Sequence, residues 1–279
     1  MLINGQPADC VAATDRGLLY GDGLFETLAV AGGRACLWRR HLDRLEEGCH
    51  RLGITMPDRI SLASEAVEVI DGRDQGVVKI IVTRGSGGRG YRADPASAAR
   101  RILQFFPFPD YPAHWWQQGI AIRFCETPLG DNPVLAGIKH LNRLEQVLAR
   151  AEWDTPEIAE GLMRDTAGRV VEGTMTNLFL VRDGELTTPP VDRCGVAGVM
   201  RGLVLDMAHR LGIPAHVREI QPPDLQGADA VFLTNSLVGI WPVRELQGWH
   251  YDVEAVPPRL RDTVRDNGFR VDDADGGWC

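Results

Sequence analysis

Two short apolar runs separated by a glycine-rich segment form the clearest pattern near the start of the chain. The runs are Leu24 to Val30 and Ala35 to Trp38, and residues 31–34 (Ala-Gly-Gly-Arg) join them. Because glycine adopts the positive φ of a tight turn at little cost, this pattern predicts a β-hairpin. Two further runs, Val77 to Thr83 and Ile102 to Phe106, are rich in β-branched or aromatic residues and are predicted as buried strands.

Helical periodicity marks three other segments. A helix is expected from about Arg39 to Gly53, where the glycine serves as a C-terminal stop. Its apolar positions, which fall on one face, are Leu42, Leu45, Cys49 and Leu52. An amphipathic helix is predicted from His140 to Trp153, and another helix from Gly198 to Leu211.

A proline-rich segment divides the chain. Phe106 to Pro112 contains three prolines, which oppose both a helix and a central strand, so residues 107–116 are predicted to be an interdomain linker. Residues 1–106 are predicted to form a smaller α/β domain and residues 117–279 a larger one that carries Lys139, discussed below. The strands predicted in the larger domain are Ile120 to Cys125, Ala230 to Leu233 and a set of short antiparallel strands within Gly161 to Thr188. The expected fold class is therefore a two-domain α+β or α/β protein.

Composition and charge narrow the classes of function. The formal net charge of -8 over 279 residues disfavours nucleic acid or an anionic membrane as partner, although a local arginine cluster can still bind a small anion. No stretch approaches the roughly 20 apolar residues of a membrane helix, and the first residues lack the features of a signal peptide. The six cysteines have neither metal-ligand nor disulfide-framework spacing, so we expect no metal and a cytoplasmic location. The acidic segment Asp272 to Cys279 is expected to be disordered.

Lys139 is the first candidate for chemistry. It has Gly137, Ile138 and Leu141 as neighbours, and it is placed between a loop and the helix predicted from His140. Apolar surroundings disfavour the ammonium form and free the amine for Schiff-base formation. Taken alone, the local sequence favours a surface lysine at the start of a helix.

Two further segments could hold a phosphorylated heterocycle. Glu172 follows two valines and precedes glycine and hydroxyl residues, which suits a carboxylate that partners a ring N–H. The segment Gly195 to Arg201 opens a helix with glycines, where backbone N–H groups can approach a phosphate. Arg44 could add a fixed positive charge to the same phosphate. Each feature separately also fits a turn, a glycine-rich loop or a solvated helix face.

Four segments in this order resemble the class IV pyridoxal-phosphate aminotransferases. They are GDGLFE (21–26), IKHLNRLEQ (138–146), EGTMTNLF (172–179) and GVMR (198–201). Within that class, RGSGGRGY (84–91) and LAGIKHLNRLE (135–145) are similar to the 4-amino-4-deoxychorismate lyases. The resemblance extends from Asn4 to about Val243. The RGSGGRGY loop is not a Walker phosphate loop, because no Gly-Lys-Ser/Thr closes it.

The resemblance implies a D-amino-acid aminotransferase-like (fold type IV) enzyme, a homodimer that holds pyridoxal 5'-phosphate between the two domains of each chain. Lys139 would carry the cofactor as a Schiff base and act as the catalytic base. The cofactor-binding residues implied are Lys139, Glu172, Arg44, Val199, Met200, Asn235, Ser236 and His140. The substrate-binding residues implied are Arg89, Tyr91 and Phe25, and the subunit that supplies Arg89 and Tyr91 stays open.

The implied reaction converts 4-amino-4-deoxychorismate, a small anionic substrate, to 4-aminobenzoate and pyruvate in folate biosynthesis. Two carboxylates on that substrate would give Arg89 a bidentate partner. A D-amino-acid or branched-chain amino-acid aminotransferase of the same fold is the nearest alternative. A non-catalytic phosphate-binding or scaffold protein, in which Lys139 is structural, is the other.

Overall fold

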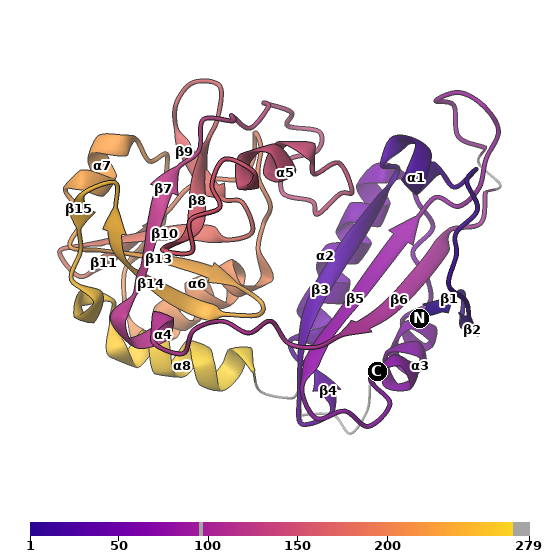
Figure 1. The fold of residues 1–279 in the computed structure, drawn as a ribbon, viewed down its shortest axis with the longest axis horizontal. Coiled ribbons are helices and arrows are strands. Elements are labelled where there is room, and N and C mark those ends of the chain that lie inside the picture. The colour runs from indigo at the N-terminus through magenta and orange to yellow at the C-terminus, as the bar shows by residue number, and fades with distance from the viewer. Residues whose placement is uncertain (95–96, 270–279) are drawn as a thin grey trace. The chain divides into compact units, whose positions relative to one another are not determined.

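The computed structural model describes residues 1–94 and 97–269, and Figure 1 shows their secondary structure. The segment Asp272 to Cys279, expected to be disordered, lies outside the described residues. The chain divides into two compact units, of which the first contains Met1–Pro109 and Ile138–Asn142 and the second Asp110–Gly137 and Arg143–Gly268. The division between Pro109 and Asp110 therefore falls inside the proline-rich segment.

An antiparallel sheet with the strand order β2-β1-β6-β5-β3-β4 forms the first unit. Its strands are β1 (Leu2–Ile3), β2 (Gln6–Pro7), β3 (Gly23–Ala31), β4 (Arg34–Ala35), β5 (Gly76–Thr83) and β6 (Arg100–Phe106). The predicted hairpin is confirmed, since Val30 pairs with Ala35. Its second strand is shorter than expected, because Leu37 adopts a left-handed conformation (φ 52°) and Trp38 already begins a helix.

The helices of the first unit are α1 (Arg16–Tyr20), α2 (Trp38–Leu52) and α3 (Arg59–Ile70). Helix α2 packs on β3 and buries Leu42, Leu45 and Cys49 of the apolar face predicted for it, whereas Leu52 is only partly buried. It ends as expected at Gly53, whose left-handed conformation (φ 61°) lets its N–H reach the last carbonyls of the helix. Helix α3, which packs on β5 and β6, was not predicted. It begins after Asp58, whose carboxylate accepts from the N–H of Ser61.

A second sheet, with the order β12-β11-β10-β13-β14-β7-β8-β9, forms the second unit. Its strands are β7 (Ile120–Phe124), β8 (Ile158–Arg164), β9 (Val170–Gly173), β10 (Asn177–Arg182), β11 (Glu185–Thr188), β12 (Ala215–Val217), β13 (Ala230–Asn235), β14 (Gly239–Leu246) and β15 (Trp249–His250). The antiparallel strands predicted within Gly161 to Thr188 are confirmed as β8 to β11. The sheet closes on itself where Glu172 of β9 pairs with Asn177 of β10.

The second unit also contains helices, most of which contact this sheet. They are α4 (Trp115–Gln118), α5 (Leu144–Arg150), α6 (Val199–Leu211), α7 (Pro222–Gln226), the 3-10 helix η1 (Val253–Ala255) and α8 (Pro258–Gly268). Helix α6, as predicted, starts directly after Gly198, and it packs on β13 and α8. Tyr111 and Trp115 lie edge-on to the buried Trp241, with ring centroids 4.9 and 5.2 Å away. The later part of the predicted linker therefore belongs to the core of the second unit.

The predicted helix from His140 is wrong at its start. Helix α5 begins only at Leu144, and Ile138–Asn142 instead runs along β3, with His140 bridging Leu24. The N–H of Phe25 donates to the Lys139 carbonyl, and the N–H of Leu141 donates to the Gly23 carbonyl, both at 3.0 Å. These bonds to the strand replace the helical ones, and they place Lys139 in the first unit rather than in the larger C-terminal domain.

Two classes of feature are absent from the part of the chain that the structure describes. No helix there combines the length and apolar character needed to cross a bilayer. Within the same residues, no group of three or more His, Cys, Asp or Glu side chains is arranged to hold a metal ion.

Candidate active site

Lys139 lies against the face of an aromatic ring. Its Nζ is 4.3 Å from the centroid of Phe25, because the backbone pairing with β3 sets the two residues beside each other. The chain contains only two lysines, and the Nζ of the other, Lys79, lies over the same ring at 5.3 Å. The amines of both lysines therefore lie over the ring of Phe25, and that of Lys139 is closer to the ring centroid.

Glu26, next to Phe25 on β3, is a buried carboxylate held by two side chains of α2. His41 Nδ1 lies 2.6 Å from Glu26 Oε2, and Arg44 donates through Nε to Oε1 at 2.8 Å and through Nη2 to Oε2 at 2.5 Å. Burial alone would raise the pKa of Glu26, but the charge of Arg44 and the bond from His41 outweigh it and lower the pKa to about 2. Arg44, predicted to face a phosphate, is therefore fixed by a bidentate ion pair.

The pKa of His41 is lowered, which favours the neutral ring. Burial lowers its pKa further than the adjacent Glu26 raises it. Because an ionised carboxylate only accepts hydrogen bonds, we assign the ring proton to Nδ1, which leaves Nε2 as an acceptor. Nε2 is buried and has no hydrogen-bond partner among the residues described.

Glu172 lies at the closure of the second sheet and is 4% exposed. Its Oε2 accepts from the backbone N–H of Val196 at 2.9 Å and from Asn177 Nδ2 at 3.3 Å. The glycines beside it make this approach possible. A Cβ on Gly195 would lie 3.2 Å from the Glu172 carboxyl carbon, and one on Gly198 only 1.9 Å from Asn177 Oδ1.

The start of α6 lies close to Glu172, because Val196, which donates to Glu172, is only three residues before the helix. Gly198 is the N-cap residue, and no side chain of the described residues caps this end of the helix. The N–H groups of the first turn, including those of Val199 and Met200, give such an end a partial positive charge. Thr234 of β13 pairs with Asn177, and its Oγ1 is buried without a hydrogen-bond partner among the described residues. This part of the second unit therefore combines three groups that could bind a ligand. They are the carboxylate of Glu172, the N-terminus of α6 and the hydroxyl of Thr234.

Asn235, predicted to contact the cofactor phosphate, shapes its own turn. Its Oδ1 accepts from the N–H groups of Leu237 and Val238 at 2.9 and 3.0 Å, and its Nδ2 reaches the Met175 carbonyl at 3.4 Å. Ser236 is partly buried in the same turn. The structure therefore gives Asn235 a local structural use in addition to any contact with a ligand.

A second fully buried carboxylate, Glu160, holds the turn between Glu172 and Asn177. It accepts from the hydroxyl and N–H of Thr174 at 2.6 and 3.2 Å, from the Met175 N–H at 3.1 Å and from the Thr176 hydroxyl at 3.1 Å. Burial raises its pKa, and these hydrogen bonds oppose the rise without cancelling it. The sequence analysis missed Glu160, although a glutamate between Ala159 and Gly161 in a mostly apolar strand was a signal.

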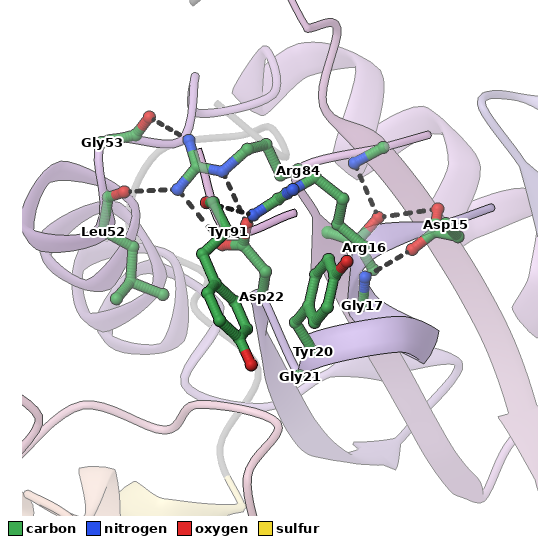
Figure 2. A network of polar contacts seen from close by, with 12 residues as sticks. Asp15, Arg16, Gly17, Tyr20, Gly21, Asp22, Leu52, Gly53, Arg84 and Tyr91 are labelled. Carbon is green, nitrogen blue, oxygen red and sulfur yellow. Dashed lines mark hydrogen bonds and ion pairs between the residues drawn. The ribbon is translucent and has the colours of Figure 1, made fainter. Parts of the chain in front are cut away.

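The predicted substrate residues Arg89 and Tyr91 lie on an exposed loop of the first unit, where the Tyr91 side chain is 87% exposed. Figure 2 shows the network beside this loop, in which Asp22 accepts from both Arg16 and Arg84. Burial would raise the pKa of Asp22, but the two guanidinium groups outweigh it and the pKa is lowered. In the sequence analysis, Asp22 appeared only as part of the GDGLFE segment (21–26), and Arg16 was missed.

Comparison with known proteins identifies the family. The family model of class IV aminotransferases matches residues 23–246. An aminodeoxychorismate lyase from Vibrio harveyi is 38% identical over 241 residues, covering 86% of this chain and 89% of the relative. A putative branched-chain-amino-acid aminotransferase from Methanocaldococcus jannaschii is 33% identical over 243 residues, covering 85% and 83%. A crystal structure of 4-amino-4-deoxychorismate lyase from Pseudomonas aeruginosa superposes with a TM-score of 0.92 and 50% identity, covering 96% of this chain and 99% of that one.

This chain belongs to the class IV aminotransferase family. The resemblance predicted from the four sequence segments is thereby confirmed, and so is the expected type IV fold. Membership of a family of class IV enzymes also removes the support for a non-catalytic scaffold. Within the first unit, the fold brings Lys139 to Phe25 and ties Arg44 to Glu26. Within the second, it brings Glu172 to the glycine-opened start of α6.

Proposed function

We propose that this class IV enzyme is a pyridoxal-phosphate-dependent lyase that converts 4-amino-4-deoxychorismate to 4-aminobenzoate and pyruvate, a step of folate biosynthesis. The observation that carries the proposal is the similarity to the two lyases, which exceeds that to the M. jannaschii aminotransferase. The loop Arg84 to Tyr91, whose sequence suggested this substrate, adds support.

Family membership supports pyridoxal 5'-phosphate as the cofactor, and the residues present fit it. The buried hydroxyl of Thr234 has no hydrogen-bond partner among the described residues, and no side chain caps the start of α6. Both features suit an anion with several acceptor oxygens. Glu172, held on one oxygen by neutral donors, suits a protonated ring nitrogen.

The proposed roles follow the sequence prediction. Lys139 would hold the cofactor through its aldehyde, and Glu172 would pair with its pyridine nitrogen. The proposed phosphate ligands are Arg44, the backbone of Val199 and Met200, Asn235 and Ser236, and His140 is a further cofactor contact. The proposed substrate contacts are Arg89, Tyr91 and Phe25.

When bound, the cofactor supplies an aldehyde for the substrate amine and a ring that delocalises electrons released at the amine-bearing carbon. The substrate amine would displace Nζ of Lys139 from the aldehyde, and the freed Nζ would take the proton from that carbon, as a general base beside the ring of Phe25. The bond from the neighbouring ring carbon to the enolpyruvyl oxygen breaks, and the proton leaves with pyruvate. Atoms and electrons balance without a further reactant, and aromatisation makes the reaction irreversible. Arg89 pairs with a substrate carboxylate and fixes its orientation.

The reaction itself is tested by incubating the purified, cofactor-loaded protein with 4-amino-4-deoxychorismate and following 4-aminobenzoate and pyruvate in equal amounts. Transamination of D-alanine or a branched-chain amino acid without 4-aminobenzoate would favour the aminotransferase alternative, which the similarity to the M. jannaschii protein keeps in view.

Lys139→Ala is expected to abolish the visible absorbance of the purified protein and its turnover, because the amine that holds the cofactor is lost. Borohydride reduction of the wild type followed by peptide mapping should find the cofactor on the Lys139 peptide. Lys79→Gln is the matched control, since it removes the only other lysine and should keep the absorbance. Normal turnover in Lys139→Ala, or a label on Lys79, would contradict the assignment.

The homodimer and the cytoplasmic location belong to the same proposal. Leu144, Val147 and Leu148 of α5 are 59% to 75% exposed, and exposed apolar groups on one helix suit a subunit interface. Cys10, Cys49, Cys125 and Cys194 are free thiols, which suits a reducing compartment. Light scattering of the purified protein tests the first point, and a mass of about 31 kDa would contradict it.

A further inference from the structure

Arg16 is an arginine buried to 4% exposure at the start of the short helix α1. All three of its guanidinium nitrogens donate hydrogen bonds, as Figure 2 lets the reader follow in part. Nε donates to Asp22 Oδ2 at 2.8 Å, Nη1 to the Gly90 carbonyl at 2.9 Å and Nη2 to the Tyr91 carbonyl at 2.9 Å. The buried Arg16 thus donates to two consecutive backbone carbonyls of a loop that lies more than 70 residues later in the sequence.

The loop that Arg16 binds is rich in glycine. Residues 84–91 contain four glycines, and Gly85 and Gly90 have φ of 86° and 102°, which other residues rarely adopt. Fixing such a segment costs more conformational entropy than fixing an ordinary loop. Gly87 passes over the Arg16 side chain, where an added Cβ would lie 3.0 Å from the Arg16 Cδ.

Tyr20, one turn after Arg16 in α1, holds the same end of the loop. Its hydroxyl accepts from the Gly90 N–H at 3.2 Å, and its ring lies edge-on to that of Tyr91 with centroids 5.4 Å apart. The Arg16 guanidinium carbon is 4.9 Å from the Tyr20 ring centroid. The two side chains therefore clamp both the backbone and the ring at the end of the loop, while Arg89 beside it stays exposed.

Asp22 connects this clamp to the rest of the first unit. It accepts from Arg84 at 2.8 Å, and Arg84 in turn donates to the carbonyls of Leu52 and Gly53 at the end of α2. Helix α2 carries Arg44, and Asp22 directly precedes β3, which carries Phe25. The loop end is thereby fixed relative to the elements of the first unit that bear proposed cofactor and substrate residues.

We propose that Arg16 is a positioning residue for the substrate: its fork of hydrogen bonds to Gly90 and Tyr91 holds Arg89 and Tyr91 where they receive a substrate carboxylate. This inference rests on the proposed substrate roles of Arg89 and Tyr91. Arg16 itself contacts the loop backbone and acts through it. Arginine is required because three donors in one plane reach three acceptors, which the single ammonium of lysine does not reproduce.

The test compares Arg16→Met and Arg16→Lys with a matched control, Arg73→Met. Arg73 also donates to two carbonyls of its own unit, those of Ile70 and Val69, and lies over an aromatic ring, that of Phe105. Arg16→Met is expected to raise KM for 4-amino-4-deoxychorismate about 10- to 100-fold with a smaller change in kcat and an unchanged visible absorbance. The KM of Arg16→Lys should lie between those of the wild type and Arg16→Met, and Arg73→Met should leave KM unchanged.

A second readout needs no substrate. Trypsin cleavage after Arg89 and Arg92 should be slow in the wild type and faster in Arg16→Met, because the loop end is released. Tyr20→Phe, which removes only the acceptor of the Gly90 N–H, should accelerate cleavage to a lesser degree and serves if Arg16→Met does not fold. Unchanged cleavage together with unchanged KM overturns the proposal, and so does a loss of thermal stability with neither effect.

Failure of the proposed reaction would be seen separately. If the wild type transaminates D-alanine instead of forming 4-aminobenzoate, the lyase assignment fails. The KM for D-alanine in the wild type and in Arg16→Met would then test the positioning role of Arg16. A wild type with neither activity overturns both proposals.

Discussion

Glu26 in the first unit and Glu160 in the second are both buried strand carboxylates, 1% and 0% exposed, yet their pKa values shift in opposite directions. Burial raises the pKa of each. The partners of Glu26 are the guanidinium of Arg44 and the ring of His41, and they lower its pKa to about 2. The partners of Glu160 are backbone N–H groups and threonine hydroxyls, and they leave its pKa raised.

The difference shows what sets the ionisation of a buried carboxylate in this protein. For Glu160, several hydrogen bonds from neutral groups do not compensate for lost hydration, whereas for Glu26 a bidentate arginine together with His41 does. The first unit accordingly fixes Arg44 through a charged pair beside Phe25. The second unit uses Glu160 to shape a turn next to Glu172. Glu26 thus orients the guanidinium of Arg44, and Glu160 orients the backbone of the turn at Thr174 and Met175.

The largest expected effect is a difference in stability between Glu26→Gln and Glu160→Gln. Glu26→Gln leaves the guanidinium of Arg44 partly buried without its carboxylate, so the free energy of unfolding should fall by about 3–5 kcal/mol. Glu160→Gln replaces an acceptor of neutral donors, and the expected loss is about 1–3 kcal/mol. Urea unfolding at pH 7 measures both. A larger loss in Glu160→Gln would break the comparison.

The pH dependence of stability should differ in sign. Because the pKa of Glu26 is lowered from 4.5 to about 2, its stabilisation is complete above pH 4.5 and is lost as the pH falls towards 2. The pKa of Glu160 is raised above 4.5, so the folded state binds its proton more tightly and its contribution decreases as the pH rises through that region.

Thermal unfolding of the wild type and of both glutamine variants from pH 2 to pH 8 measures these contributions. The advantage of the wild type over Glu26→Gln should shrink on acidification, and its advantage over Glu160→Gln should grow. Parallel curves for the two variants would show that the carboxylates do not differ.

The parts of the site that sequence predicted are those with a local signal. Glu172 and Gly198 lie in segments whose glycines and apolar neighbours already indicate a turn and a helix start, and the structure has both. Lys139 was found through its apolar neighbours and the segment order. Its placement along β3 had no local signal, because that pairing joins residues more than 100 positions apart. The periodicity after His140 therefore predicted a helix four residues too early.

The partners of the buried carboxylates were harder to predict for a different reason. His41 and Arg44 lie three residues apart on α2, and polar or charged residues on a helix are most often solvated. Only the contact with Glu26, 15 and 18 residues earlier, distinguishes them from a solvated face. Glu160 likewise finds its donors in a turn 14 to 16 residues later. A charge inside an apolar strand indicates a buried partner but does not identify it.

The smallest expected effect concerns two buried threonines of the second unit. Thr176 donates to Glu160 at 3.1 Å, so Thr176→Val should lower the free energy of unfolding by about 1 kcal/mol. The hydroxyl of Thr234, equally buried, has no hydrogen-bond partner among the described residues. Thr234→Val should therefore leave the stability of the cofactor-free protein unchanged or raise it slightly, because an unpaired buried hydroxyl already carries a desolvation cost. If Thr234 serves the cofactor, the same variant should bind pyridoxal 5'-phosphate more weakly, as fluorescence titration would measure. Equal destabilisation of the two cofactor-free variants would mean that Thr234 has a protein partner and is no indicator of a ligand.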